Sequence, residues 1–337
     1  MRTLCSTLCV ILLSSICLAQ DAAKQISAAT IKIEKQLTTL KVPDDLVQQC
    51  TNEIALVRSH LKLGYVYLSL YTIRNCHIEL ASLAFAASKG DVQERGASVL
   101  EEDWRKLGSV LAEKEKTVSD QGSKQLPAVI VALADVSQIQ VKQYYQSGRL
   151  FALNSNMAEG IYYLGRAPAS LDFAIFCRGL QFSKPKSTMK LRSLEPELTK
   201  LETMVLRTYK SADISSQQSQ YNRLNSNLKI GAELNKASLF EGALLKYLES
   251  KLYFGLLITT AEKEDLQHLQ ARSKEAGKLL TTEKADHSIA LLFWQMAETA
   301  LNQPGSTQPT PAQIRRAVVI LNDVLPSYFD YMKGSQQ

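Results

Sequence analysis

Apolar residues recur at intervals of three and four positions along most of this chain. Leu46, Cys50, Ile54, Val57 and Leu61 give the clearest run. This spacing places apolar side chains on one face of an α-helix, with polar residues on the opposite face. Alternation of polar and apolar residues, which would indicate a β-strand, is limited to a brief ambiguity at 129–131. The pattern therefore predicts an all-α chain.

Proline, glycine and polar residues divide this pattern into segments and set the predicted helix ends. The segment at 46–88 either continues as one helix or bends near Gly64. The last helix carries its own start signal, because Thr310, Pro311 and Gln313 form a capping box with proline at the first helical position. The predicted helices cover residues 21–40, 46–88, 99–111, 126–145, 150–164, 167–182, 194–209, 221–237, 240–258, 262–280, 283–301 and 310–325.

The first nineteen residues have the organisation of a secretory signal peptide. Arg2 supplies the positive charge, residues 8–16 form a short apolar core, and Ala19 offers a small residue before Gln20. The apolar core is shorter than the ~20 residues that span a bilayer. Lipidation of Cys17 and an uncleaved anchor are the alternatives to cleavage. We expect residues 1–19 to be removed and the mature chain to be exported, to the periplasm or beyond.

Cysteine usage and glycosylation signals bear on the source of the chain. Cys50, Cys76 and Cys177 remain after the signal peptide, and no C-x-x-C pair occurs. Three cysteines in a large helical core do not form a disulfide framework, so we expect a protein that is stable without a bridge. The chain also lacks the N-x-S/T signal for glycosylation. Both features favour the bacterial envelope over a eukaryotic secreted protein.

Composition and charge narrow the class further. Hydrophobic residues make up 45% of the chain and charged residues 21%, which is ordinary for a globular domain. The net charge of +6 is spread along the helices, so it lacks the basic face of a nucleic-acid binder. The most apolar stretch, 61–85, contains Lys62, Arg74, His77 and Glu79, which argues against a membrane span in the mature chain. We expect one helical domain at 20–337, with a candidate subdivision near 183–190.

One segment has a more specific spacing. Glycine follows a large apolar residue, an apolar residue stands one turn later, and a small residue opens the next helix. The positions are Ile230, Gly231, Leu234, Ala243, Tyr247 and Ser250. This unit, at about 224–257, resembles a tetratricopeptide repeat. The resemblance implies two antiparallel helices in close contact where Gly231 faces Ala243, with Lys246 on the outer side.

Other copies of this unit are degenerate. Leu63 and Gly64 begin like the repeat, and so do Leu164 and Gly165, but their second helices do not match. The tryptophan of the family's first helix is absent, and Asn227 occupies its place in the best unit. We therefore expect about 10–12 helices in stacked antiparallel hairpins, as an irregular tetratricopeptide-like solenoid or a compact bundle. The pattern also resembles exported helical proteins of soil bacteria, which implies no activity.

A search for chemistry-bearing motifs identifies no catalytic, cofactor-binding or metal-binding residue. No H-E-x-x-H, G-x-S-x-G, phosphate-binding glycine loop or G-x-G-x-x-G occurs. Asp265 and His268 have the spacing of half a di-iron motif, but the second half is missing. Cys76 and His77 are adjacent, so they point to different sides of a helix.

Two classes of function remain open. The favoured one is a non-enzymatic helical-repeat protein that binds a protein or peptide partner in the bacterial envelope. The alternative is an exported all-α enzyme that acts on cell-wall glycan with a carboxylate pair, for which Glu159 or Glu79 is a candidate member. Aromatic pairs either line a groove for such a ligand or belong to the core. These pairs are Tyr144-Tyr145, Tyr162-Tyr163 and Phe293-Trp294.

Overall fold

The structure of the 337-residue chain is a computed structural model. Of the described residues, 87% are helical and none forms a β-strand, which confirms the all-α prediction. The predicted signal peptide lies outside the described residues, and so do most of the predicted loops at 119–124 and 183–187. The structure describes residues 20–90, 97–120, 125–154, 156–182, 190–209, 217–259, 265–282, 285–302 and 308–335.

The chain divides into two compact units, and it passes between them more than once. Unit 1 comprises Met1–Leu126 and Ser137–Pro185, and unit 2 comprises Pro127–Val136 and Lys186–Gln337. Helix α7 (Ala128–Leu153) therefore begins in unit 2 and continues in unit 1.

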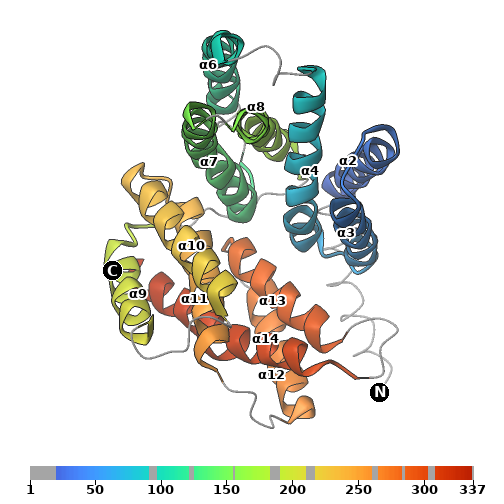
Figure 1. Ribbon diagram of the computed structural model, residues 1–337. Helices are drawn as coiled ribbons and strands as arrows, with labels where there is room; N and C mark the ends of the chain where they lie inside the picture. Colours follow the sequence, from blue (N-terminus) through green and yellow to red (C-terminus); the bar gives the residue numbers. More distant parts are fainter. Residues whose placement is uncertain are drawn as a thin grey trace. The chain divides into compact units, whose positions relative to one another are not determined.

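In unit 1, α4 is the central helix. It packs against α2, α3 and α8, while α6 lies along α8 (Figure 1). Leu70, Ile73 and Leu80 of α4 are almost fully buried, so the apolar residues of this helix form much of the core of the unit. The helices of this unit, besides α7, are α2 (Gln20–Thr39), α3 (Asp44–Lys62), α4 (Val66–Ser88), α6 (Ala97–Asp120) and α8 (Met157–Gly179).

Gly64 separates α3 from α4. Its φ of +76° lies in the left-handed region, which glycine adopts without the steric cost that a Cβ would add. The amides of Gly64 and Tyr65 donate to the carbonyls of Leu61 and His60, at 3.1 and 2.8 Å, and so close the turn. The segment at 46–88 is therefore a helical hairpin, and the choice between a continuous and a bent helix is decided in favour of a full break.

The break between α7 and α8 lies later than the sequence suggested. Helix α7 ends at Leu153 and α8 begins at Met157, where the Asn156 side chain accepts a hydrogen bond from the Glu159 amide and caps α8. Pro168 lies inside α8 and does not open a helix of its own. Gly148 and Gly160 let the two helices approach closely, since a Cβ on Gly148 would lie 2.9 Å from the Gly160 carbonyl oxygen.

A disulfide joins Cys50 of α3 to Cys76 of α4, with their Cα atoms 5.6 Å apart. The expectation of a protein without a bridge is therefore wrong. In one continuous helix the 26-residue separation would hold the two cysteines roughly 39 Å apart. The Gly64 turn instead folds α4 back onto α3 and brings the thiols together. Cys177 is buried and free.

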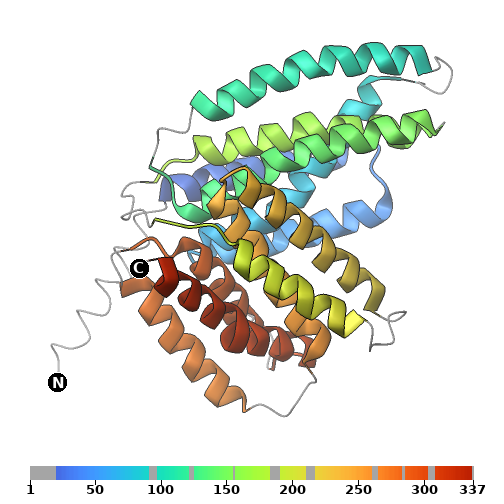
Figure 2. The same cartoon turned by 90° about the vertical axis from the view of Figure 1, so that its left-hand side faces the viewer.

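Unit 2 is organised around α11, which contacts α9, α10 and α14. Figures 1 and 2 show α9 and α10 running side by side along this unit. Residues 242–250 of α11 are all buried, so this helix is surrounded on every side at its middle. The helices of the unit, with the first turns of α7, are α9 (Glu195–Tyr209), α10 (Gln218–Lys236), α11 (Phe240–Ile258), α12 (Leu266–Thr282), α13 (Ser288–Leu301), α14 (Pro311–Val319) and α15 (Leu325–Ser335).

The last helix begins with the capping box that its sequence signals. The Thr310 side chain accepts from the Gln313 amide, and the Gln313 side chain accepts from the Thr310 amide. A short π-helix at Ile320–Val324 joins α14 to α15 without a loop. With these segments counted as one helix, the described residues contain twelve helices. None of the described helices combines the length and apolar character that a membrane span requires.

Asp286 caps two helices in unit 2. One carboxylate oxygen accepts from the Ala128 amide at 2.6 Å, at the start of α7. The other accepts from the Ser288 amide at 2.9 Å, at the start of α13. The Ser288 hydroxyl in turn accepts from the Val129 amide at 3.0 Å. Because the first amides of a helix have no partner within it, these acceptors allow both helix starts to be buried.

We expect reduction of the Cys50–Cys76 disulfide to lower the free energy of unfolding by about 3 kcal/mol, because the bridge restricts a 26-residue loop in the unfolded chain. Urea titrations followed by circular dichroism, with and without a phosphine reductant, measure the difference. The double variant Cys50→Ala/Cys76→Ala is the control and should not respond to the reductant. Identical wild-type midpoints in both conditions would contradict the bridge.

Candidate functional site

The tetratricopeptide-like positions lie in the hairpin formed by α10 and α11. The two helices are joined by a short turn at 237–239, where Ser238 has a φ of +58°. All six positions are buried, so each serves the packing of unit 2 rather than its surface. They are Ile230, Gly231, Leu234, Ala243, Tyr247 and Ser250.

Gly231 lies where α10 and α11 approach each other. A Cβ at this position would lie 3.4 Å from the Cβ of Lys246 and 3.9 Å from the carbonyl oxygen of Ala243. The same Cβ would lie 3.3 Å from a methyl group of Leu198 on α9. Three helices therefore meet at this glycine, and the close approach extends beyond the hairpin itself.

Lys246 does not lie on the outer side of the hairpin, contrary to the sequence-based expectation. It is 5% exposed, and its Nζ donates to Asn227 Oδ1 at 3.0 Å and to Glu249 Oε2 at 2.5 Å. Asn227 stands where the repeat family has tryptophan, so a polar side chain replaces an apolar one on the inner face of α10. Lys246 supplies the hydrogen bond that this buried amide needs.

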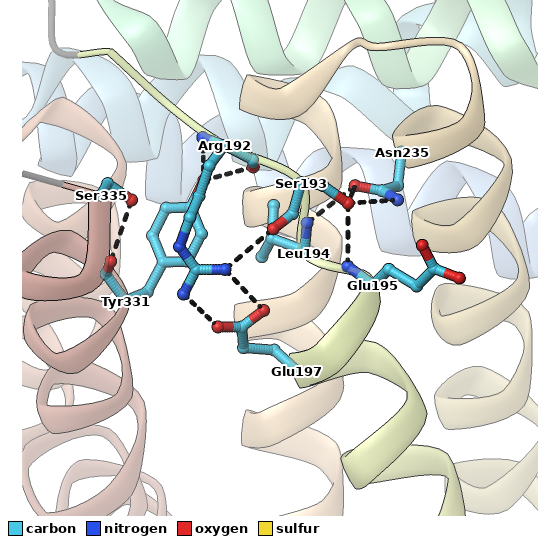
Figure 3. A network of polar contacts seen from close by, with 8 residues as sticks. All are labelled: Arg192, Ser193, Leu194, Glu195, Glu197, Asn235, Tyr331 and Ser335. Carbon is cyan, nitrogen blue, oxygen red and sulfur yellow. Dashed lines mark hydrogen bonds and ion pairs between the residues drawn. The ribbon is translucent and has the colours of Figure 1, made fainter. Parts of the chain in front are cut away.

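A polar network fixes the segment that leads into α9 (Figure 3). The Arg192 amide donates to the Tyr331 hydroxyl at 2.9 Å, and that hydroxyl donates to the Arg192 carbonyl at 2.7 Å. The guanidinium pairs with Glu197 at 2.5 Å and lies 4.8 Å from the centre of the Tyr331 ring. The hydrogen bond that Arg192 donates to Glu197 raises the pKa of Arg192. The network therefore ties α9 to α15.

Asn235 completes this network from the end of α10. Its side-chain oxygen accepts from the Leu194 amide at 2.8 Å, and its amide nitrogen donates to the Ser193 hydroxyl at 3.1 Å. That hydroxyl also accepts from the Glu195 amide at 3.3 Å, which caps α9. A broad, open depression of about 720 Å³ lies beside Arg192 along the outer face of α9. The polar groups nearest to this depression, on Arg192, Ser193 and Glu195, thus hold the start of α9 in place.

A second cluster surrounds Arg166 on α8 in unit 1. Its guanidinium lies 4.6, 5.5 and 5.8 Å from the ring centres of Tyr144, Tyr162 and Tyr163. One of its nitrogens pairs with Glu79 Oε1 at 2.7 Å, and the Tyr162 hydroxyl donates to the other oxygen of Glu79. We call these five residues the Arg166 cluster. All five are half-buried.

The sequence pointed to the three tyrosines and to Glu79 but missed Arg166. The missed signal is helical spacing, because Arg166 follows Tyr162 by four residues and Tyr163 by three on α8. An arginine at this spacing reaches the faces of both rings, where cation–π attraction holds it.

The two carboxylates proposed for glycan hydrolysis have different surroundings. Burial raises the pKa of Glu79, and the charge of Arg166 opposes that shift. Glu159 is exposed, and its side chain accepts a hydrogen bond from Asn156 at 2.6 Å in the first turn of α8. Glu79 is thus paired with a cation, and Glu159 takes part in a helix cap.

The remaining aromatic residues singled out in the sequence belong to helix packing. Tyr145 packs on Trp104 of α6, with the ring centres 4.6 Å apart. Phe293 is fully buried, and the Trp294 ring nitrogen donates to the Ser273 carbonyl at 2.7 Å. The depression beside Arg192 is not lined by tyrosine.

His77, His268 and His287 lie in different parts of the structure. His77 packs against Phe173 and Phe176, and burial lowers its pKa to about 4. His287 Nδ1 lies 2.8 Å from the Tyr328 hydroxyl inside unit 2. His268 is exposed. Across the described ranges, no group of three or more His, Cys, Asp or Glu side chains is arranged to hold a metal ion.

Comparison with protein families, with curated proteins and with solved structures finds no match for this chain.

The hairpin packing makes a prediction about stability. We expect Ala243→Phe to lower the free energy of unfolding by ~1–3 kcal/mol or more, because Ala243 is fully buried where Gly231 approaches it. Ala232→Phe on the exposed face of α10 makes the same change and should cost under ~0.5 kcal/mol. Thermal melts followed by circular dichroism compare the two. Equal melting temperatures would show that the two helices are not in contact at this register.

Proposed function

We propose that this chain is an exported, non-enzymatic helical protein that binds a protein or peptide partner in the bacterial envelope. The observation that carries the proposal is the Arg166 cluster, which gathers three tyrosines and an arginine on neighbouring helices of unit 1. Tyrosine and arginine are enriched in protein interfaces and at the positions that dominate their binding energy. The signal-peptide pattern at 1–19 supports export.

The cluster is suited to binding because its rings are held in place before a partner arrives. Arg166 lies against the rings, and Tyr163 also stacks on Phe151 with the ring centres 5.1 Å apart. Side chains that are already ordered lose less conformational entropy on association. Glu79 balances the charge of Arg166, so a partner meets aromatic faces rather than an uncompensated cation. These features favour a neutral, partly apolar partner surface.

The same contacts weigh against the glycan-hydrolase alternative. A general acid in such an enzyme must hold a proton near neutral pH and deliver it to the substrate. Burial raises the pKa of Glu79, but both of its carboxylate oxygens are already engaged, one by Arg166 and the other by the Tyr162 hydroxyl, so the group is held within the cluster rather than presented to a substrate. Glu159 is exposed in the first turn of α8, where its side chain accepts a hydrogen bond from Asn156. We therefore place binding ahead of catalysis.

Site-specific photocrosslinking tests the proposal in the cells that produce the chain. Tyr163→p-benzoylphenylalanine keeps an aromatic group in the cluster, and Tyr253→p-benzoylphenylalanine on α11 of unit 2 is a matched half-buried control. Irradiation should give a discrete adduct with one protein or peptide at position 163 and none at 253. Mass spectrometry identifies the adduct. No adduct at 163, or the same adducts at both positions, would contradict binding through the cluster.

A further inference from the structure

A separate groove lies in unit 1 between α4, α6 and α8, and it has a volume of about 360 Å³ (the three helices are labelled in Figure 1). This volume falls within the range of small-molecule sites. Its floor comes from Gly165, Pro168 and Ala169 of α8. These residues are small or lack a long side chain, so α8 leaves space between its neighbours. We call this feature the lysine-rimmed groove, for the charges described below.

The walls of the groove are apolar and formed in part by exposed groups. Phe85 of α4 and Leu107 and Val110 of α6 line it. Val110 is 42% exposed, although removing a valine side chain from water is energetically favourable. Phe85 also packs against Gly165, since a Cβ on that glycine would lie 3.0 Å from the Phe85 ring. The groove is therefore a hydrophobic surface formed by three packed helices, and an apolar chain can cover it.

The rim carries three lysines against one carboxylate. Lys89 directly follows α4, Lys106 and Lys114 lie one turn to either side of Val110 on α6, and Asp172 lies on α8. Lys114 pairs with Asp172, and Lys106 pairs with the exposed Glu102 at 2.6 Å. An exposed ion pair contributes little, so the Lys106 ammonium turns readily towards another anion. With Glu102 counted beside Asp172, the rim keeps an excess of one positive charge, which is complementary to the single charge of an anionic head group.

We infer that the lysine-rimmed groove binds a single-chain amphiphile with an anionic head, such as a fatty acid carboxylate. The acyl chain lies over Val110, Phe85 and the floor from α8, and the carboxylate lies at the rim beside a lysine ammonium. This inference is independent of the partner proposed for the Arg166 cluster, because the groove uses different residues.

The lining also favours an acyl chain over a peptide. Apart from the three lysines and Asp172, the side chains that line the groove are apolar, and none carries a hydrogen-bonding atom. An extended peptide would bring amide groups into this space, and buried amides without partners cost free energy. An acyl chain brings only methylene groups.

Isothermal titration calorimetry on the mature chain tests the inference with dodecanoate below its micelle concentration. Dodecanol and dodecyltrimethylammonium have the same chain with a neutral or a cationic head. Dodecanoate should bind at least tenfold more tightly than either. Val110→Glu puts a negative charge inside the groove and should weaken dodecanoate binding at least tenfold. Ser109→Glu, an exposed neighbour on α6 outside the lining, should change it less than twofold.

Circular dichroism of both variants confirms that α6 remains folded. The inference is overturned if dodecanoate does not bind, if the cationic amphiphile binds as tightly, or if both variants weaken binding equally. It is also overturned if dodecanoate fails and an acidic amphipathic leucine–glutamate peptide binds with sensitivity to Val110→Glu. That outcome would make the groove a docking site for a protein helix. Photocrosslinking at Tyr163 is unaffected by any of these results, so the two proposals fail separately.

Discussion

The fold of unit 2 depends on the double cap formed by Asp286. The first turns of α7 are among the most deeply buried in the chain, with Val129, Ile130 and Leu133 fully inaccessible to water. A helix start in such a place leaves amides that water cannot reach, and each needs an acceptor. Asp286 and Ser288 supply those acceptors and also start α13. One carboxylate thus fixes where α7 enters the unit and where α13 begins.

Other buried or half-buried polar groups also find their hydrogen-bond or ion-pair partners within the fold. Lys246 donates hydrogen bonds to both Asn227 and Glu249 inside the α10–α11 hairpin, and the charge of Glu79 balances that of Arg166. The features left for recognition lie on different faces of α8. Residues 162, 163 and 166 form the stripe of the Arg166 cluster, while residues 165, 168, 169 and 172 form the stripe that lines the lysine-rimmed groove. One helix therefore presents two chemically distinct surfaces.

Local signals in the sequence predicted local structure well. Helical periodicity gave the all-α class, and the Thr310 capping box forms as its residues indicate. Features that depend on how helices meet were not predictable in the same way. The Cys50–Cys76 bridge was missed because it requires a complete turn at Gly64. The groove draws on α4, α6 and α8, segments far apart in the chain, and no single periodic pattern brings their residues together.

Hydrogen exchange monitored by mass spectrometry tests the double cap most directly. Asp286→Ala removes acceptors from two buried helix starts, and Asp265→Ala is a matched control at an exposed start, where Asp265 accepts from the Gln267 amide at 3.0 Å. A lost cap costs ~0.5–2 kcal/mol, so exchange in Asp286→Ala should accelerate severalfold or more in 129–136 and in the first turn of α13. Exchange in α2, α3 and α4 should stay unchanged, and Asp265→Ala should affect only the start of α12. Unchanged exchange at 129–136 in Asp286→Ala would contradict the account.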